Sequence, residues 1–293
     1  MPKIQLLQRK EIDDAQWDKC INDSPNRIVY ALTWYLDVIA DAKWTGYVYG
    51  DYAAVMPVII KKKYFIPYVF SPLLYQQSGI FCSEPLNEGV ISDFFKQLKK
   101  LVWKMEIKTT GPFPIDINST KLVNHVMDIG KSYLEIVSSY HRNTIRNLRF
   151  ADNYALVMDY SKSNDAVYNF IRDNDPTGIL KNNNPYIKNI YDQVLRIEKG
   201  FHVSVTENNE QIAAGFFVIH GDRMYFLLCA SNERGRQLRA MYFLIDQVIK
   251  KYAQSLKYFD FTGSNIPNIA RRNEGFGASD EIYFQLSWQK IYF

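Results

Sequence analysis

The sequence contains few cysteines and no long apolar run. Its 293 residues include only Cys20, Cys82 and Cys229, and no two of them have the spacing of a metal-binding pair. We expect buried thiols from a reducing compartment and no metal site. No apolar run approaches the ~20 residues of a membrane span, and the N-terminus has no apolar segment of export length. These absences predict a cytoplasmic protein without a membrane span.

The chain also carries only a small net charge. The 35 Lys and Arg residues against 31 Asp and Glu residues leave a net charge of +4, without the dense basic stripe of a dedicated nucleic-acid-binding protein. A phosphate-bearing ligand is compatible with this balance. Aromatic residues are abundant, with 21 Tyr and 18 Phe, and 47% of the chain is hydrophobic. The chain can therefore bury a large core in which aromatic rings provide much of the packing.

The second half of the chain shows a clear order of expected elements. Residues 201–230 form three strand-like runs separated by two turn signals, which predicts an antiparallel meander. Apolar residues then repeat at spacings of three and four along 236–254, which predicts an amphipathic helix. The segment 257–263 alternates like a strand and places the single acid Asp260 on one face. The expected order is three strands, a helix and a strand.

The first half repeats this order loosely. Residues 44–70 predict three strands, 88–105 an amphipathic helix, and 113–120 a strand in which Asp116 takes the place of Asp260. This repetition favours two similar α/β units over one large sheet. We expect the units to span residues 1–130 and 131–293.

Three lysines lie between apolar runs in residues 55–70. The segment has two interpretations, a membrane-surface element or a β-hairpin with a solvated lysine tip. Its alternation and its prolines favour the hairpin.

A basic segment, Ser132 to Asn153, lies at the start of the second expected unit. Ser132 and Glu135 have the spacing of a capping box, so we expect one helix across this segment. In such a helix Arg142 and Arg146 lie on one edge, and arginine suits bidentate recognition of phosphate or carboxylate. The alternative is a solvated basic face.

Several of these stretches together resemble the FemAB-like branch of the GNAT superfamily. The resemblance is carried by "YHRNTIRNLRFADNY", "FLLCASNERGRQLRAMYFLIDQVIKKYA", "YFDFTGSNIPNI" and "NEGFGA". It implies two tandem GNAT-like units, each a mixed, mostly antiparallel twisted sheet flanked by helices, in an α/β chain. It also implies transfer of an acyl or aminoacyl group to an amine, in a gap where strands 223–230 and 257–263 splay apart.

The resemblance places the expected site in the second unit. Asp260 is the expected general base, with a structural acid as the alternative, and a backbone N–H at a bulge near Leu228 or Cys229 is expected to stabilise the oxyanion. The turn 263–265 and the arginines after it are expected to bind an anion. The residues expected to bind substrate are Arg142, Arg146, Tyr225, Thr262, Ser264, Arg271, Arg272 and Asn273.

Two departures from the family pattern affect the donor. The loop that binds coenzyme A in ordinary GNAT enzymes is rich in glycine, whereas this chain has "SNERGRQLRAM" with a single glycine. In cell-wall aminoacyl transferases of the family a lysine lies near the substrates, and here Asn273 takes its position. We therefore expect no coenzyme A binding in the usual mode, and no cofactor is assigned.

Three functions remain open from the sequence. The first is an N-acyl or aminoacyl transferase acting on an amine of a small molecule or a phosphorylated precursor, with acyl-CoA or aminoacyl-tRNA as the open donors. The second is a catalytically inactive GNAT-like module that binds an anionic ligand. The third is an aminoacyl-tRNA-dependent cell-wall peptide transferase, with tRNA as a partner.

Overall fold

The computed structural model describes residues 3–175, 177–263 and 266–290, which pack into two compact units. Unit 1 comprises Met1–Leu122 and Ile282–Phe293, and unit 2 comprises Val123–Glu281. The expected boundary after residue 130 stays a prediction. The structure adds that the last segment of the chain, from Ile282, belongs to unit 1 although it follows unit 2 in the sequence.

Unit 2 is built on a mixed sheet. Its strands follow the order β8 (Asn118–Asp128), β13 (Tyr258–Asp260), β12 (Arg223–Ser231), β11 (Glu210–His220), β10 (Gly200–Glu207) and β9 (Leu156–Asp159). All neighbours in this order are antiparallel except β12 and β13, which run parallel. The expected meander is therefore confirmed as β10, β11 and β12.

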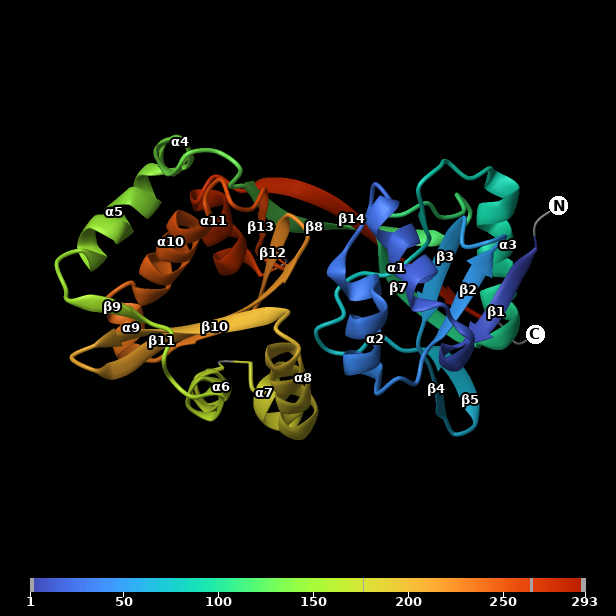
Figure 1. The fold of residues 1–293 in the computed structure, drawn as a ribbon, viewed down its shortest axis with the longest axis horizontal. Coiled ribbons are helices and arrows are strands. Elements are labelled where there is room, and N and C mark those ends of the chain that lie inside the picture. The colour runs from blue at the N-terminus through green and yellow to red at the C-terminus, as the bar shows by residue number, and fades with distance from the viewer. Residues whose placement is uncertain (1–2, 176, 264–265, 291–293) are drawn as a thin grey trace. The chain divides into compact units, whose positions relative to one another are not determined.

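Helices cover both faces of this sheet (Figure 1). Helices α5 and α10 lie on one face, and α6 and α8 lie on the other. The helices of unit 2 are α4 (Tyr133–Ser138), α5 (Arg142–Ala151), α6 (Asn164–Asp173), α7 (Ile179–Asn182), α8 (Asn184–Arg196), α9 (Glu233–Gln237), α10 (Ala240–Tyr252) and α11 (Pro267–Gly275).

The core of unit 2 follows from the periodicity of the sequence. On α10, Leu244, Ile245, Val248 and Ile249 recur at helical spacing and are fully buried. They pack in one cluster with Phe217 of β11, Phe226 of β12 and Phe259 of β13. Burying each of these side chains contributes about 1.5–3 kcal/mol. The helix expected over 236–254 is present as α10, with the short helix α9 before it.

Unit 1 repeats the order of elements less regularly. Its strands form two sets, β1 (Ile4–Gln8), β2 (Thr45–Tyr49), β3 (Ala54–Val58) and β6 (Phe81–Cys82), and β4 (Ile60–Lys63), β5 (Ile66–Val69), β7 (Lys104–Thr109) and β14 (Ser279–Gln289), of which β14 belongs to unit 1 from Ile282 onward. Its helices are α1 (Asp14–Asp23), α2 (Thr33–Ala40) and α3 (Glu88–Leu101), with 3₁₀ turns at Arg9–Glu11 and Val29–Ala31. The parallel pair β5 and β7 corresponds to β12 and β13.

The strand expected over 113–120 was wrong for most of its length. Pro112 and Pro114 lack a backbone N–H and cannot donate to a ladder, and Asp116 lies exposed in a turn. The strand that follows the helix is β7, because α3 ends at Leu101. Asp116 is therefore not the counterpart of Asp260.

The single helix expected across Ser132 to Asn153 was also wrong. The capping box of Ser132 and Glu135 is present and starts α4, but this helix ends at Ser138. The backbone N–H of His141 donates to the carbonyl of Gly275 at 2.8 Å, outside the helix, and α5 starts after it. A tertiary contact thus breaks a helix that local propensity favours.

Candidate functional site

The strands β12 and β13 separate in unit 2. They are paired at only three positions, from Arg223 opposite Tyr258 to Tyr225 opposite Asp260. Beyond this point β12 continues to Ser231, whereas β13 ends. The splay expected from the resemblance is present.

A β-bulge lies where the two strands separate. Phe226 pairs with Phe217 of β11 and Leu228 pairs with Phe216, so Leu227 is the extra residue on β12. A bulge leaves its extra residue outside the ladder, and this frees a peptide group. The bulge was expected near Leu228 or Cys229, and the structure has it at Leu227.

Thr262 links the two separating strands. Its φ of 53° lies in the left-handed region, which a β-branched residue adopts only under constraint. The constraint has two parts: its hydroxyl donates to the carbonyl of Phe226, and its N–H donates to Oδ1 of Asp260 at 2.8 Å. Thr262 therefore holds the residue just before the bulge.

Asp260 is the centre of a buried polar network. Arg223 Nη1 donates to its Oδ2 at 3.0 Å, and Asn124 Nδ2 donates to its Oδ1 at 2.9 Å. Arg223 also donates to both carboxylate oxygens of Glu281, at 2.8 and 3.1 Å. The side-chain oxygen of Asn124 in turn accepts from the N–H of Gly263 at 2.9 Å, so the network fixes the start of the next turn.

The two carboxylates of the network differ in their electrostatics. Burial raises the pKa of Asp260 above its usual value, and the charge of Arg223 offsets only part of this effect. At Glu281 burial also acts to raise the pKa, but the hydrogen bonds and charge of Arg223 outweigh it and hold the pKa low. The environment therefore shifts the pKa values of the two carboxyls in opposite directions.

Arg272 approaches β12 beyond the bulge. The positive charge of its guanidinium is close enough to the Cys229 thiol to act on the pKa of that group. Burial raises the pKa of Cys229, and Arg272 opposes this by favouring the thiolate. The same guanidinium donates to the side-chain oxygen of Asn273 at 3.0 and 3.2 Å. Cys229, and with it Arg272, thus lies at the part of β12 that is no longer paired with β13.

The other expected binding residues lie in different environments. Tyr225 and Asn273 are buried, whereas Arg142, Arg146 and Arg271 are exposed. Ser264 lies outside the described residues. The N-terminal end of α5, which carries Arg142, packs closely against the end of α11. A Cβ added to Gly275 of α11 would lie only 2.5 Å from the hydroxyl of Thr144 on α5.

Asp260 and Arg272 face different sides of the sheet. Asp260 alternates with Phe259 and Phe261, which pack in the α10 core together with Cys229, the neighbour of Arg272. The carboxylate of Asp260 therefore points to the opposite face. These two expected site residues therefore lie on opposite faces of the sheet, and the backbone of the separating strands β12 and β13 lies between them.

The segment expected to replace a coenzyme A loop is folded into helix α9. Asn232 caps this helix by accepting from the N–H of Gly235 at 2.8 Å. A Cβ on Gly235 would lie 2.1 Å from the carbonyl of Ile212, so its lack of a side chain serves packing against β11. Leu238 is buried. The only glycine of this segment is thus used for packing.

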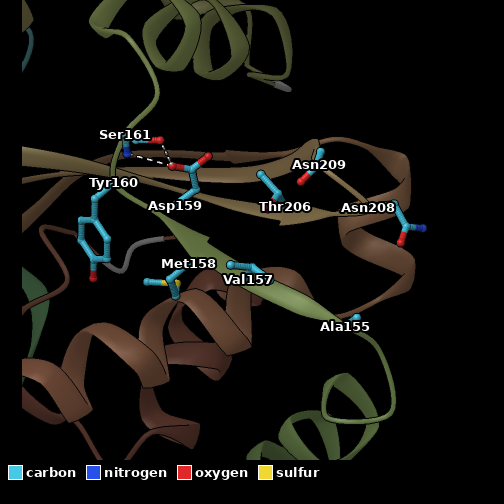
Figure 2. Close-up of a pocket in the computed structure, with 9 residues that line it drawn as sticks. All are labelled: Ala155, Val157, Met158, Asp159, Tyr160, Ser161, Thr206, Asn208 and Asn209. Carbon is cyan, nitrogen blue, oxygen red and sulfur yellow. Dashed lines mark hydrogen bonds between the residues drawn. The ribbon is translucent and has the colours of Figure 1, made fainter.

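A surface pocket of about 680 Å³ lies beside the edge strand β9. Figure 2 shows its lining, in which Asp159 accepts hydrogen bonds from the N–H and hydroxyl of Ser161. None of the expected site residues lines it. We assign it no chemistry.

Clusters of metal-ligating side chains and membrane-spanning helices are both absent from the described part of the chain. No group of three or more His, Cys, Asp or Glu side chains there is arranged to hold a metal ion. Within those same residues, none of the helices has both the length and the apolar character to cross a membrane.

Comparison with known proteins identifies the fold. The structure of FemX is similar over 96% of each chain, with a TM-score of 0.67 and 12% identity. The chain has a FemAB-like GNAT fold. A tandem GNAT protein from the clavulanic acid biosynthesis pathway matches over 98% of each chain with a TM-score of 0.52 and 10% identity. The structure of L-PGS from Bacillus licheniformis covers 95% of this chain and 92% of its own, with a TM-score of 0.52 and 12% identity.

Sequence-level comparisons give no further family for this FemAB-like GNAT fold. No family model matches the chain. No curated protein sequence matches it either.

Sequence reasoning missed three residues of the Asp260 network. Asn124 and Glu281 lie on β8 and β14, two strands that were not expected, and Arg223 was noted only as the start of a strand. Their hydrogen bonds join residues 136 positions apart in the case of Asn124 and Asp260. The alternation of Ile282, Phe284 and Leu286 was the available signal for β14, but no local pattern pairs it with Asp260.

Proposed function

We propose that this protein is an N-acyl or aminoacyl transferase that acts in the gap between β12 and β13. The observation that supports the proposal most is the splay of these strands at a bulge on Leu227. Such a gap admits an extended acyl donor, and a peptide N–H freed at the bulge is suited to receive a carbonyl oxygen. FemAB-like proteins, which this fold resembles, use the corresponding gap for acyl transfer.

Acyl transfer to an amine requires one bond to form, one bond to break and one proton to move. The nitrogen of the acceptor amine attacks the carbonyl carbon of an ester or thioester, a C–N bond forms, and the bond to the leaving oxygen or sulfur breaks. The proton lost by the amine is finally carried by the leaving group. A freed N–H near Leu227 would stabilise the negative charge on the carbonyl oxygen, a contribution of about 3–4 kcal/mol in other acyl-transfer enzymes.

Asp260 serves this reaction through Thr262. Its Oδ1 accepts two hydrogen bonds, and its Oδ2 accepts one from Arg223. With the carboxylate so occupied and 2% exposed, we propose that Asp260 acts first as a positioning residue that holds Thr262, and through it Phe226, beside the bulge. The role of general base stays a prediction, which the raised pKa favours.

The leaving group and the acceptor are proposed to bind through anionic groups. Arg272 acts on Cys229 of the unpaired part of β12, and Arg142 lies at the start of α5, which packs against the helix that carries Arg272. Arginine binds phosphate in a bidentate manner. Because α9 occupies the segment that cradles coenzyme A in ordinary GNAT enzymes, we propose a donor other than coenzyme A in the usual mode. The resemblance to FemAB-like enzymes leaves aminoacyl-tRNA as an alternative donor, although Asn273 replaces the family lysine.

An inactive anion-binding module is the second candidate. It is favoured by the saturated hydrogen bonding of Asp260, which needs no reaction to explain it. In that case the arginines bind the ligand and the gap performs no chemistry.

A labelled transfer screen tests the proposal. Protein-free cell extract supplies amines, and ¹³C-labelled acetyl-coenzyme A or ¹³C-aminoacyl-tRNA supplies the acyl group. Mass spectrometry is then used to find labelled amides that form only with the protein. We expect a product with one donor and a large loss with Thr262→Val, while Thr120→Val, at an exposed position, acts like the wild type. Absence of any labelled amide, combined with tight binding of an anionic metabolite, would favour the binding module.

A further inference from the structure

The hairpin of β4 and β5 in unit 1 ends in two exposed aromatic residues. The two-residue turn consists of Tyr64 and Phe65, whose side chains are 85% and 93% exposed. Ile66, the next residue, is 47% exposed. The hairpin expected from the sequence is thus present, but the lysines lie on β4 and the tip is aromatic.

The turn is conformationally unfavourable for these residues. Tyr64 has a φ of 50° and Phe65 a φ of 65°, so both lie in the left-handed region. Two-residue hairpin turns of this kind favour Asn-Gly or Asp-Gly, and bulky side chains adopt this conformation at a cost. Their exposure means that packing within the chain does not compensate for that cost. Unfavourable backbone conformations that packing within the chain does not explain cluster at functional sites.

Positive charge surrounds the tip. Lys61, Lys62 and Lys63 are exposed on β4. Lys61 and Lys63 lie opposite Tyr68 and Ile66, so these four residues share one face of the hairpin. Among the residues that the structure describes, no carboxylate forms an ion pair with any of the three lysines.

A groove continues this face at the base of the hairpin. It has a volume of about 540 Å³ and is lined by apolar and aromatic side chains with lysines at its rim. The lining includes Lys63, Ile66, Tyr68, Trp103, Lys104 and Lys290. Lys290 Nζ lies 4.9 Å from the centre of the Trp103 ring, and Lys61 Nζ lies 3.7 Å from that of Phe70. Lysine stems and aromatic rings are thus combined throughout this surface.

We propose that this surface docks on an anionic lipid bilayer, with Tyr64 and Phe65 inserted at the interface and the lysines against lipid phosphates. The geometry fits this occupant. Lys61 lies three residues behind the tip, or about 10 Å along an extended strand. Apolar groups of interfacial proteins enter a bilayer to a depth of about 5–10 Å, so Lys61 would lie at the level of the phosphates. The charge of the lysines is complementary to that of anionic lipid.

This inference does not depend on acyl transfer, because all of its residues belong to unit 1. A second copy of the chain and an acidic protein are the other occupants that an aromatic and basic surface can take. Binding to a bilayer differs from binding to either of these partners, because it requires lipid molecules that are assembled into a membrane. A soluble headgroup such as glycerol 1-phosphate offers the phosphate without the apolar interior.

Vesicle sedimentation with the full chain tests the proposal. Vesicles of phosphatidylglycerol and phosphatidylcholine in about equal amounts should bind the protein, and vesicles of phosphatidylcholine alone should not. The double variant Tyr64→Asn/Phe65→Gly should lose about tenfold or more in vesicle affinity. Because Asn-Gly suits the turn, its melting temperature should equal or exceed that of the wild type, which separates lost binding from lost folding.

Charge variants provide the matched comparison. Lys61→Gln/Lys63→Gln should weaken binding by about 30-fold, from the contribution of each lysine near an anionic surface. Lys10→Gln/Lys181→Gln, at exposed positions elsewhere, should bind as the wild type does. Wild-type affinity of the Tyr64→Asn/Phe65→Gly variant would overturn the proposal. Full competition by glycerol 1-phosphate would also overturn it. So would dimers that form without vesicles, if sedimentation velocity detects them in the wild type but not in that variant.

Discussion

Arg223 and Asp260 form a buried ion pair at the point where β12 and β13 separate, with 3.0 Å between Nη1 and Oδ2. Their side chains are 15% and 3% exposed, and Arg223 is shared with Glu281. The pair lies beside the last paired position of the two strands, Tyr225 opposite Asp260. Its charge balance therefore stabilises the part of the sheet that frames the gap.

Arg223→Met should strongly destabilise the protein. It leaves the buried carboxylate of Asp260 and the partly exposed carboxylate of Glu281 without their cation, and removing one partner of a buried pair costs about 3–5 kcal/mol of unfolding free energy. Urea unfolding measures this loss. The matched control is Arg234→Met, whose bond to Glu207 involves an arginine that is 49% exposed and should cost less than about 1 kcal/mol. Equal losses in the two variants would mean that the buried pair contributes no more than a surface one.

Thr262→Val removes the hydroxyl of Thr262 but keeps the shape of its side chain, and we expect the variant to be less stable than the wild type. The change leaves the carbonyl of Phe226 without its donor, and such a loss costs about 1–3 kcal/mol. Thr262→Ser keeps the hydroxyl and should remain close to the wild type. Thermal unfolding of the three proteins provides the measurement, and a valine variant as stable as the serine variant would show that the hydroxyl is not needed.

His202 should make stability depend on pH. It is buried between a hydrogen bond to the Tyr191 hydroxyl at 2.7 Å and one to the Lys162 carbonyl at 3.1 Å. Burial lowers its pKa, and the bond to Lys162 offsets this only in part. Below the ordinary pKa of about 6.5 the unfolded chain binds a proton that the folded protein does not, so stability falls as pH falls.

The measurement is the unfolding free energy of the wild type and of His202→Gln at about pH 7.5 and pH 5.5. The loss on acidification should be smaller in the variant. An identical loss in both proteins would assign the pH dependence to other groups.

Acetyl-coenzyme A should bind weakly. Helix α9 and the buried Leu238 leave no glycine-rich loop for the pyrophosphate, so we expect a dissociation constant above about 10 μM by calorimetry. Any residual affinity should fall with Arg271→Ala, because this arginine and the turn before α11 are the proposed alternative site for the anion. Tighter binding that is unaffected by Arg271→Ala would show that coenzyme A uses another site.

The parts of the fold that depend on local pattern were predictable from the sequence. The β10 to β12 meander, α10 and the capping box of Ser132 follow from alternation, helical spacing and short motifs. The splay and the bulge came from the family resemblance, and the structure has both. The position of the bulge differed by one residue, since a register shift depends on the partner strand.

The missing parts depend on contacts between distant residues. Asn124 and Glu281 reach Asp260 from strands far away in the sequence, and the break between α4 and α5 depends on the carbonyl of Gly275. Asp116 looked equivalent to Asp260 because the order of elements suggested it, whereas two prolines prevent the strand. Whether Arg142, Arg146 and Arg271 bind an anion stays a prediction.

Alkylation of Cys229 tests the central claim, that the acyl donor binds in the gap between β12 and β13. Cys229 is partly exposed there beside Arg272, whereas Cys20 and Cys82 are buried elsewhere. Cys229→Ala should retain transfer, because the thiol is not proposed as a nucleophile. The decisive measurement is the rate of N-ethylmaleimide labelling of Cys229, followed by mass spectrometry, with and without the donor found in the transfer screen. At about ten times its dissociation constant the donor should slow labelling about tenfold. An unchanged labelling rate at a donor concentration that saturates transfer would contradict the account.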